Sequence, residues 1–312
     1  MKTIKKILLG LLVISALASF RWHHNFDQLS TPAESNLTVS GISGNIGIKW
    51  VALGNNPHGA LLLPVQIKGI KKTFYMQLDL GSPSTILYKK SLQSIPQELI
   101  DDVPFNKDSN HIAMNLILKG MNISSKTFRL LDYGDKLDFE DPNAANIIGT
   151  IGTDLLEKRI IILDFRNRRC SFTDKVKENG STPFEFKQRR ILIPAKIENE
   201  NVKVMYDSGT SGYQLITSKE IWENYRIPNG KVQSEEVNSW GDPLSAISAP
   251  ANKEIHFGTT RLRLSEVTYI EGATALNISM MKRSGMRGMV GNKLFLKYRL
   301  VLDCKNQMFK IE

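Results

Sequence analysis

Two similar segments of the sequence are separated by a constant 139 residues. "GTIGTDLLEKRIIILDFRN" begins at Gly149, "GMVGNKLFLKYRLVLDCKN" begins at Gly288, and the two align without a gap. The identical pairs are Gly149/Gly288, Gly152/Gly291, Leu155/Leu294, Lys158/Lys297, Leu163/Leu302, Asp164/Asp303 and Asn167/Asn306. Agreement at so many places is improbable by chance, so the chain contains an internal repeat. The repeat limits the fold strongly, because each half must build the same ordered parts.

A second pair of matching segments lies upstream of the first. "LLLPVQI" around Pro64 resembles "RILIPAKI" around Pro194, and each is followed within 15 residues by an acid–glycine turn. These turns are "DLGS" at 79–82 and "DSGT" at 207–210. The second half is about 11 residues longer between its turn and its Gly-x-x-Gly segment, which predicts an extra or longer loop there.

Short β-type runs dominate the chain and predict an all-β fold. They are aliphatic or aromatic, are bounded by Gly, Asn, Asp or Pro, and cover 60–67, 73–80, 84–88, 115–123, 127–133, 159–165, 191–197, 202–207, 213–217, 255–264 and 298–304. Short helices are expected where polar and apolar residues recur at helical spacing, at 89–94, 153–158, 218–225 and 292–297.

The N-terminus has the features of a secretory signal. "MKTIKK" is a basic region, "ILLGLLVISAL" is an apolar region, and Ala16-Leu17-Ala18 is a cleavage site. The uncharged run is shorter than the roughly 20 residues that span a bilayer, so a retained membrane anchor is the weaker alternative. We therefore expect residues 1–18 to be removed, residues 19–45 to form an extended or loosely ordered lead-in, and the lobes to cover 46–180 and 181–312, with a linker-like stretch at 173–188.

Charge and cysteine content exclude some classes of protein. The formal net charge is +10, but the basic residues are scattered, which does not favour a nucleic-acid-binding surface. The only two cysteines, Cys170 and Cys304, cannot make a disulfide framework, and two buried free thiols are favoured over one bridge. His58, His111 and His256 are isolated, so no metal site is expected.

One acid in each half has a chemical explanation. Two related halves pack about a pseudo-twofold axis, and an element near that axis meets its own counterpart. Asp79 and Asp207 would then form a pair of carboxyls that share a proton, one acting as a general base for water and the other as a general acid. Gly81 and Gly209 allow tight turns, and the hydroxyls of Ser82 and Thr210 are expected to hydrogen-bond the carboxylates. The alternative is that each Asp-x-Gly is an ordinary turn; Asp164 and Asp303 are interpreted as turn acids of that kind.

At these motifs the chain resembles the pepsin- and retropepsin-type aspartic peptidases. "DSGTS" at 207–211 fits the family pattern, "DLGS" at 79–82 fits except at Leu80, and "GTIGTDLL" is similar to the segment under the active-site loop of retropepsins. The resemblance runs from about residue 60 to the end. It implies two β-barrel-like lobes with a cleft between them, a catalytic dyad of Asp79 and Asp207, structural glycines Gly152 and Gly291 under the active-site loops, and no cofactor.

One departure from the family pattern concerns the hydrogen-bonded grip between the two loops. In the family, the residue after each catalytic Asp carries a hydroxyl that takes part in this grip. Leu80 has no hydroxyl, so the grip is expected to be one-sided, through Ser208. A flap tyrosine is not identifiable in the first half, and Trp240, in the longer loop of the second half, is the candidate lid residue.

The sequence thus predicts an exported, periplasmic or secreted, aspartic endopeptidase that acts on peptides or unfolded proteins. A catalytically silent peptide-binding protein that lost turnover through Leu80 is the alternative from another class. A structural β protein that merely duplicated is a third interpretation, and it leaves both acid–glycine turns unexplained.

Overall fold

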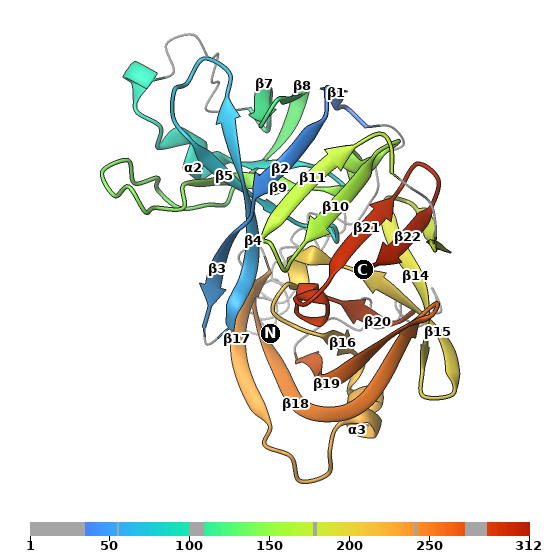
Figure 1. Ribbon diagram of the computed structural model, residues 1–312. Helices are drawn as coiled ribbons and strands as arrows, with labels where there is room; N and C mark the ends of the chain where they lie inside the picture. The colour runs from blue at the N-terminus through green and yellow to red at the C-terminus, as the bar shows by residue number, and fades with distance from the viewer. Residues whose placement is uncertain (1–34, 55, 100–108, 177–179, 240–241, 272–285) are drawn as a thin grey trace, which may run out of the picture. The chain divides into compact units, whose positions relative to one another are not determined.

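The protein is described from a computed structural model that covers residues 35–54, 56–99, 109–176, 180–239, 242–271 and 286–312. Residues Ser35–Glu312 form one compact unit. The strands of this unit assemble into three sheets (Figure 1), and helices are few and short. The predicted all-β class is therefore confirmed.

The first eight-stranded sheet closes on itself. Its order is β1-β8-β6-β9-β5-β4-β3, and β7 pairs with both β4 and β8, so six of the strands form a ring. The strands are β1 (Thr38–Ser40), β3 (Lys49–Leu53), β4 (Asn56–Ile67), β5 (Phe74–Leu78), β6 (Ile86–Tyr88), β7 (His111–Leu118), β8 (Met121–Leu131) and β9 (Ile147–Ile151). Short helices α2 (Lys89–Gln93) and η1 (Gln97–Leu99) follow β6.

The second eight-stranded sheet closes in the same way. Its order is β13-β14-β15-β20-β16-β19-β18-β17, and β14 also pairs with β18. The strands are β13 (Glu185–Lys187), β14 (Arg190–Ile197), β15 (Glu200–Tyr206), β16 (Leu215–Thr217), β17 (Gln233–Ser239), β18 (Asp242–Phe257), β19 (Thr260–Glu271) and β20 (Met286–Val290). Helix α3 (Lys219–Tyr225) begins after Ser218, whose hydroxyl caps it by accepting a hydrogen bond from the Ile221 amide.

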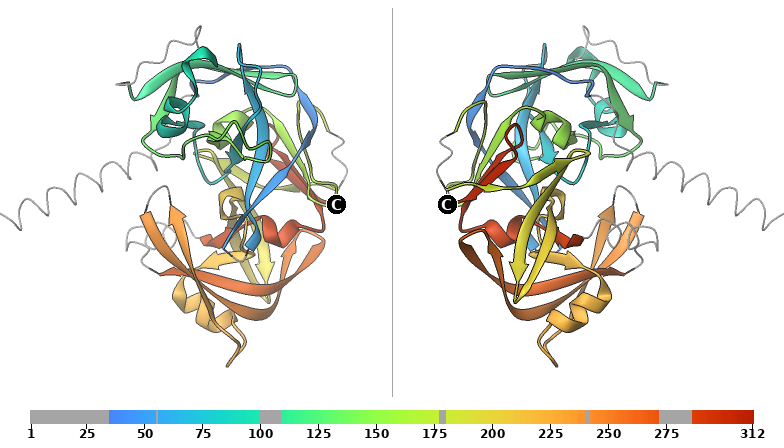
Figure 2. Two further views of the ribbon diagram at one scale, coloured as in Figure 1. Left: turned by 90° about the vertical axis from the view of Figure 1, so that its left-hand side faces the viewer. Right: turned by 90° about the vertical axis from the view of Figure 1, so that its right-hand side faces the viewer.

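The two barrels have the same pairing pattern. In the first, β5 runs parallel to β9 and β6 parallel to β8; in the second, β15 runs parallel to β20 and β16 parallel to β19. The strands β6 and β16 are antiparallel to β9 and β20. The repeat seen in the sequence is thus a repeat of structure, and Figure 2 shows the two barrels, the first in blue to green and the second in yellow to orange.

A six-stranded antiparallel sheet connects the halves. Its order is β12-β22-β21-β10-β11-β2, with β2 (Ser43–Gly47), β10 (Ile160–Asp164), β11 (Arg169–Thr173), β12 (Thr182–Pro183), β21 (Arg299–Asp303) and β22 (Met308–Ile311). In its central pair, β10 and β21, Ile162 lies opposite Val301. These two residues are separated by the repeat distance of 139. Each is therefore the other's equivalent, and a local pseudo-twofold axis passes between them.

Several predicted elements need correction. The runs 115–123 and 255–264 are not single strands but the turns of two hairpins, β7–β8 and β18–β19, because Gly120 and Gly258 adopt a positive φ and reverse the chain. The helices predicted at 153–158 and 292–297 are the short 3-10 helices η2 (Thr153–Leu156) and η4 (Asn292–Phe295). The segment predicted as a lead-in, 19–45, contains β1 and the beginning of β2, which belong to sheets.

The cysteines and the repeated turn acids behave as predicted. Cys170 and Cys304 are both free and buried, and burial raises the pKa of each thiol. Asp164 accepts a hydrogen bond from the Asn167 amide, and Asp303 accepts the equivalent one from Asn306. Both acids are structural parts of turns in the six-stranded sheet.

Candidate active site

The two acids Asp79 and Asp207 occupy equivalent places in the barrels. Asp79 directly follows β5 and its amide donates to the carbonyl of Ile151 at 3.0 Å. Asp207 directly follows β15 and its amide donates to the carbonyl of Val290, also at 3.0 Å. Each acid is therefore fixed at the end of a strand by the neighbouring parallel strand of its own barrel.

Turns after the strands orient both carboxylates. Asp79 Oδ1 accepts hydrogen bonds from the amides of Gly81 (3.0 Å) and Ser82 (3.1 Å). Asp207 Oδ1 accepts from the amide of Gly209 at 2.7 Å, which caps the 3-10 helix η3 (Ser208–Thr210). Such side-chain-to-backbone bonds are those of Asx turns, and here they fix the direction in which each carboxyl points.

The turns bring the two carboxyls together, one from each half. Asp79 and Asp207 share a side-chain hydrogen bond. A β-carbon added at Gly81 would lie 2.5 Å from Asp207 Oδ1, and one added at Gly209 would lie 2.5 Å from Asp79 Oδ1. Each glycine thus lies against the carboxylate of the other half, and glycine is required at both positions because any side chain would collide there.

The surroundings of the two carboxyls differ, and so do the influences on their pKa values. Asp207 is only 7% exposed, whereas Asp79 is partly exposed. Burial raises the pKa of the Asp207 carboxyl well above its usual range, and the neighbouring Asp79 charge raises it further. Burial also raises the pKa of Asp79, but the hydrogen bond from Asp207 and those from two backbone amides lower it in part. The two carboxyls therefore titrate as one pair, and the direction of the shifts favours the shared proton on Asp207.

A hydroxyl of the second half bridges two backbone groups of the first. Ser208 Oγ accepts a hydrogen bond from the Leu80 amide (2.9 Å) and donates one to the Leu78 carbonyl (2.8 Å). Leu80, at the equivalent position of the first half, is fully buried. Its side chain has no polar atom that could make the corresponding hydrogen bonds to the second half. The grip between the loops is one-sided, as the sequence predicts.

The other two hydroxyls of the turns do not bind the carboxylates. Ser82 Oγ donates to the carbonyl of Ser84 at 2.8 Å, and Thr210 Oγ1 donates to the carbonyl of Asp207 at 2.9 Å. The predicted hydroxyl–carboxylate contacts are therefore wrong, because both hydroxyls donate to backbone carbonyls of the tight turns instead. The Ser82 amide, rather than its hydroxyl, reaches the Asp79 carboxylate.

The two repeated glycines of the Gly-x-x-Gly segments lie against the loops that carry the acids. A β-carbon at Gly152 would approach the Ser84 carbonyl carbon to 2.4 Å, and one at Gly291 would approach the Thr210 carbonyl oxygen to 2.1 Å. Neither position has room for a side chain. The backbone of each segment consequently supports the loop of its own half.

Two buried polar residues within two positions of these glycines were given no role in the sequence analysis. Asp154 accepts hydrogen bonds from the Thr85 amide (2.8 Å) and hydroxyl (2.7 Å), and burial raises its pKa to about 6. Asn292 accepts from the Tyr206 hydroxyl (2.6 Å) and donates to Ser211 Oγ (2.9 Å). A polar residue within two positions of a Gly in an otherwise apolar segment is the signal that could have identified them.

The candidate lid residue, Trp240, lies outside the described residues. The strands on either side of it, β17 and β18, form an antiparallel hairpin in which Ser239 pairs with Asp242. Among the residues that the structure describes, no group of three or more His, Cys, Asp or Glu side chains is placed to hold a metal ion. No helix within the same residues is long and apolar enough to cross a membrane.

Comparisons with known proteins find similarity among solved structures. No family model matches the chain, and no curated protein matches it. Among solved structures, the chain is similar to the crystal structure of an aspartic proteinase from Irpex lacteus, with 10% sequence identity and a TM-score of 0.48 over 87% of this chain and 97% of that one. The strand pairing of this protein by itself defines its two barrels.

Proposed function

We propose that the protein is an aspartic endopeptidase that hydrolyses peptide bonds with a water molecule activated between Asp79 and Asp207. The observation that carries this proposal is the meeting of two hydrogen-bonded carboxyls, one from each half, whose pKa values are both raised by burial. Perturbed titratable groups that converge in this way are typical of catalytic sites. The need for glycine beside each carboxylate supports the same interpretation.

The proposal gives the two acids different roles, in line with the direction of their pKa shifts. Asp79, ionised, takes a proton from water as the water oxygen bonds to the carbonyl carbon of the substrate, and Asp207 gives its proton to the carbonyl oxygen. In the second step Asp79 returns its proton to the leaving nitrogen while the C–N bond breaks, and Asp207 recovers a proton from the diol. Water is the only co-reactant in these two steps, and no cofactor is required.

We further propose that the substrates are peptides or unfolded proteins, which can present an extended strand to the two loops. The N-terminal sequence supports export to the periplasm or the exterior, and residues 1–18 would be absent from the mature protein. Mass spectrometry of the exported protein tests this directly, since we expect the mature chain to begin at Ser19.

Cleavage assays test the activity. Protein lacking residues 1–18 is incubated with an unfolded protein from pH 3 to 8, beside Asp79→Asn and Asp207→Asn, and the products are identified by mass spectrometry. We expect cleavage by the parent and a loss on the order of 10²- to 10⁴-fold in each variant. Cleavage that persists in either variant would contradict the dyad.

A silent peptide-binding protein is the second candidate, and one observation favours it. The loops are held by the hydroxyl of Ser208 alone, since Leu80 contributes no hydroxyl. If the folded parent cleaves nothing across this pH range, binding of peptides to the parent but not to Gly81→Ala would support the silent protein.

A further inference from the structure

The hairpin that begins the second barrel has an unusual turn. Strands β13 and β14 pair through Lys187 and Arg190, which leaves Gln188 and Arg189 as a two-residue turn. Both turn residues adopt a left-handed conformation, with φ of +50° and +55°. Turns of this kind favour Asn and Gly, and side chains such as these two are strained there. A strained position persists where the surrounding structure holds it in place.

The side chain of Arg189 reaches the first half of the molecule and is 4% exposed. Its Nε donates to Glu157 Oε1 at 2.6 Å, and its Nη1 donates to the carbonyl of Pro83 at 3.4 Å. Its backbone carbonyl accepts a hydrogen bond of 2.6 Å from Thr153 Oγ1. All three partners belong to the first half, so Arg189 connects the halves at a point away from the six-stranded sheet.

These contacts lead to the loop that carries Asp79. Thr153 Oγ1, which donates to the Arg189 carbonyl, is also within 2.9 Å of the Ser82 carbonyl. The Ser82 amide donates to Asp79 Oδ1, and Pro83 is the next residue along the chain. Arg189 is therefore hydrogen-bonded to Pro83 and Thr153, the direct neighbours of the Ser82 residue that orients the Asp79 carboxylate.

Stability alone does not explain this arginine. Its Nη2 has no hydrogen-bond partner among the described residues, and its carboxylate partner Glu157 is 38% exposed. A buried ion pair with imperfect geometry contributes little to stability compared with apolar packing. Arg189 thus combines a strained backbone with a buried charge that lacks one hydrogen-bond partner. A role in holding the neighbouring loop in place explains this combination better than a contribution to stability does.

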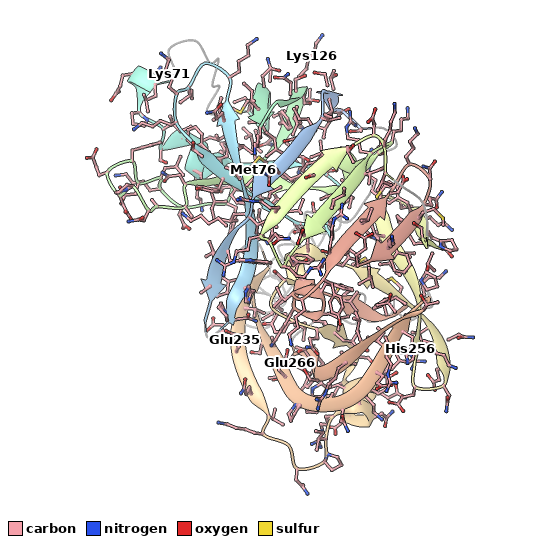
Figure 3. The ribbon with its side chains drawn as sticks, viewed as in Figure 1. Lys71, Met76, Lys126, Glu235, His256 and Glu266 are labelled. Atoms are coloured by element: carbon pink, nitrogen blue, oxygen red, sulfur yellow. The ribbon has the colours of Figure 1, made fainter. Side chains whose placement is uncertain are left out.

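The equivalent hairpin of the first half makes a matching contact with the second half. The two contacts are therefore related by the pseudo-twofold axis. The β3–β4 hairpin of the first half extends to the second barrel, and the amide group of Asn56 donates to the carbonyl of Gly212, in the loop after Asp207. At the tip of this hairpin, a β-carbon at Gly54 would collide with the carboxylate of Glu235 on β17, which lies beside it (Figure 3). Each half thus sends its first hairpin to the acid-bearing loop of the other.

On the basis of the proposed function, we propose that Arg189 is a positioning residue for Asp79. It holds the Ser82–Pro83 part of the loop from the second half, where Leu80 leaves the grip between the loops one-sided. The charge of Arg189 lowers the pKa of the buried Asp154 in part, and Glu157 pairs with the guanidinium. Without Arg189 the Asp79 carboxylate would lose its alignment with Asp207, although the barrels would remain folded.

A comparison of matched variants tests the proposal. Arg189→Gln removes the charge and the contacts of the guanidinium. Lys203→Gln is the control, because it breaks the 2.6 Å ion pair between Lys203 and Glu185, which lies within the second half near the same hairpin. Arg189→Lys retains a charge for Glu157 but has no second nitrogen to reach Pro83.

Two readouts separate positioning from stability. The first is the NMR titration of aspartate carboxyl carbons in ¹³C-labelled protein, with Asp79→Asn and Asp207→Asn used for assignment. The second is the division of the catalytic effect between kcat and KM for a cleaved peptide. We expect Arg189→Gln to bring the two apparent pKa values of the pair closer together and to lower kcat on the order of 10- to 100-fold, with little change in KM. Arg189→Lys should recover the melting temperature but not kcat, and Lys203→Gln should match the parent.

The titration does not need turnover, so the two proposals can fail separately. Closer pKa values in Arg189→Gln support the positioning role even if the parent cleaves no peptide. Unchanged pKa values and kcat, with only a lower melting temperature, would overturn it even if the parent is an active peptidase. If Arg189→Gln yields no folded protein, Glu157→Gln takes its place, and an unchanged titration in that variant overturns the proposal equally.

Discussion

The hydroxyl of Ser208 lies between two backbone groups of the other half of the molecule, accepting from the Leu80 amide and donating to the Leu78 carbonyl. Ser208→Ala would leave both groups buried and unpaired at this point. We expect the free energy of unfolding to fall by roughly 2 kcal/mol or more. Urea denaturation measures this change, and Ser208→Thr, which retains the hydroxyl, is the control. A Ser208→Ala protein as stable as the parent would show that the bridge contributes nothing.

The contact between Gly81 and the Asp207 carboxylate makes a second prediction. Gly81→Ala would place a β-carbon 2.5 Å from Asp207 Oδ1, so the carboxyls must separate. We expect peptide cleavage to fall on the order of 100-fold, since small displacements of reacting groups have effects of this size. Gly44→Ala is the matched control, because no atom lies within 4 Å of its added β-carbon. Equal activity of the two variants would contradict the geometry of the pair.

The contact between Asn56 and Gly212 can be tested by a double-mutant cycle. A β-carbon at Gly212 would lie 2.2 Å from Asn56 Nδ2, so Gly212→Ala alone should lower the free energy of unfolding by about 1–3 kcal/mol through overpacking. Combined with Asn56→Ala, which removes the colliding group, the same substitution should have a smaller effect. Strictly additive effects of the two changes would mean that the hairpin does not approach the loop as described.

Asp154 predicts a specific pH dependence of stability. Its pKa is raised from 3.8 to about 6 in the folded protein, so folding disfavours its ionised form. The resulting destabilisation is absent below pH 4, develops as the pH rises from about 4 to 6, and reaches roughly 3 kcal/mol at most above that range. Asp154→Asn cannot titrate, so the stability of the parent relative to this variant should fall over the window. Urea denaturation at pH 4 and pH 7 checks this, and a relative stability that rises with pH would contradict it.

The repeat made much of the fold predictable. The gapless alignment from Gly149 and Gly288 identified two equivalent halves, and the register of Ile162 with Val301 shows why: the repeated segments lie on either side of a local axis. Short apolar runs bounded by turn residues predicted most strands correctly. They misjudged the β7–β8 and β18–β19 hairpins, because apolar residues continue through turns marked only by Gly120 and Gly258.

The candidate site was predictable only in part. The acids and glycines are recognisable because tight turns need those residue types, and Leu80 correctly indicated a one-sided grip. The destinations of the Ser82 and Thr210 hydroxyls depend on turn geometry, which residue type does not specify. Arg189 carried no signal in the sequence, because its partners are Glu157, Thr153 and Pro83 of the other half and only the folded chain brings them together.

The central claim is that Asp79 and Asp207 act as one unit, and the most direct measurement compares their single and double variants. Cleavage of an unfolded protein is measured at the pH optimum of the parent for Asp79→Asn, Asp207→Asn and the double variant, each shown to be folded by circular dichroism. If the carboxyls share one proton and one water, each single variant should lose as much activity as the double variant. Losses that simply multiply, or a single variant that keeps most of its activity, would contradict a shared site.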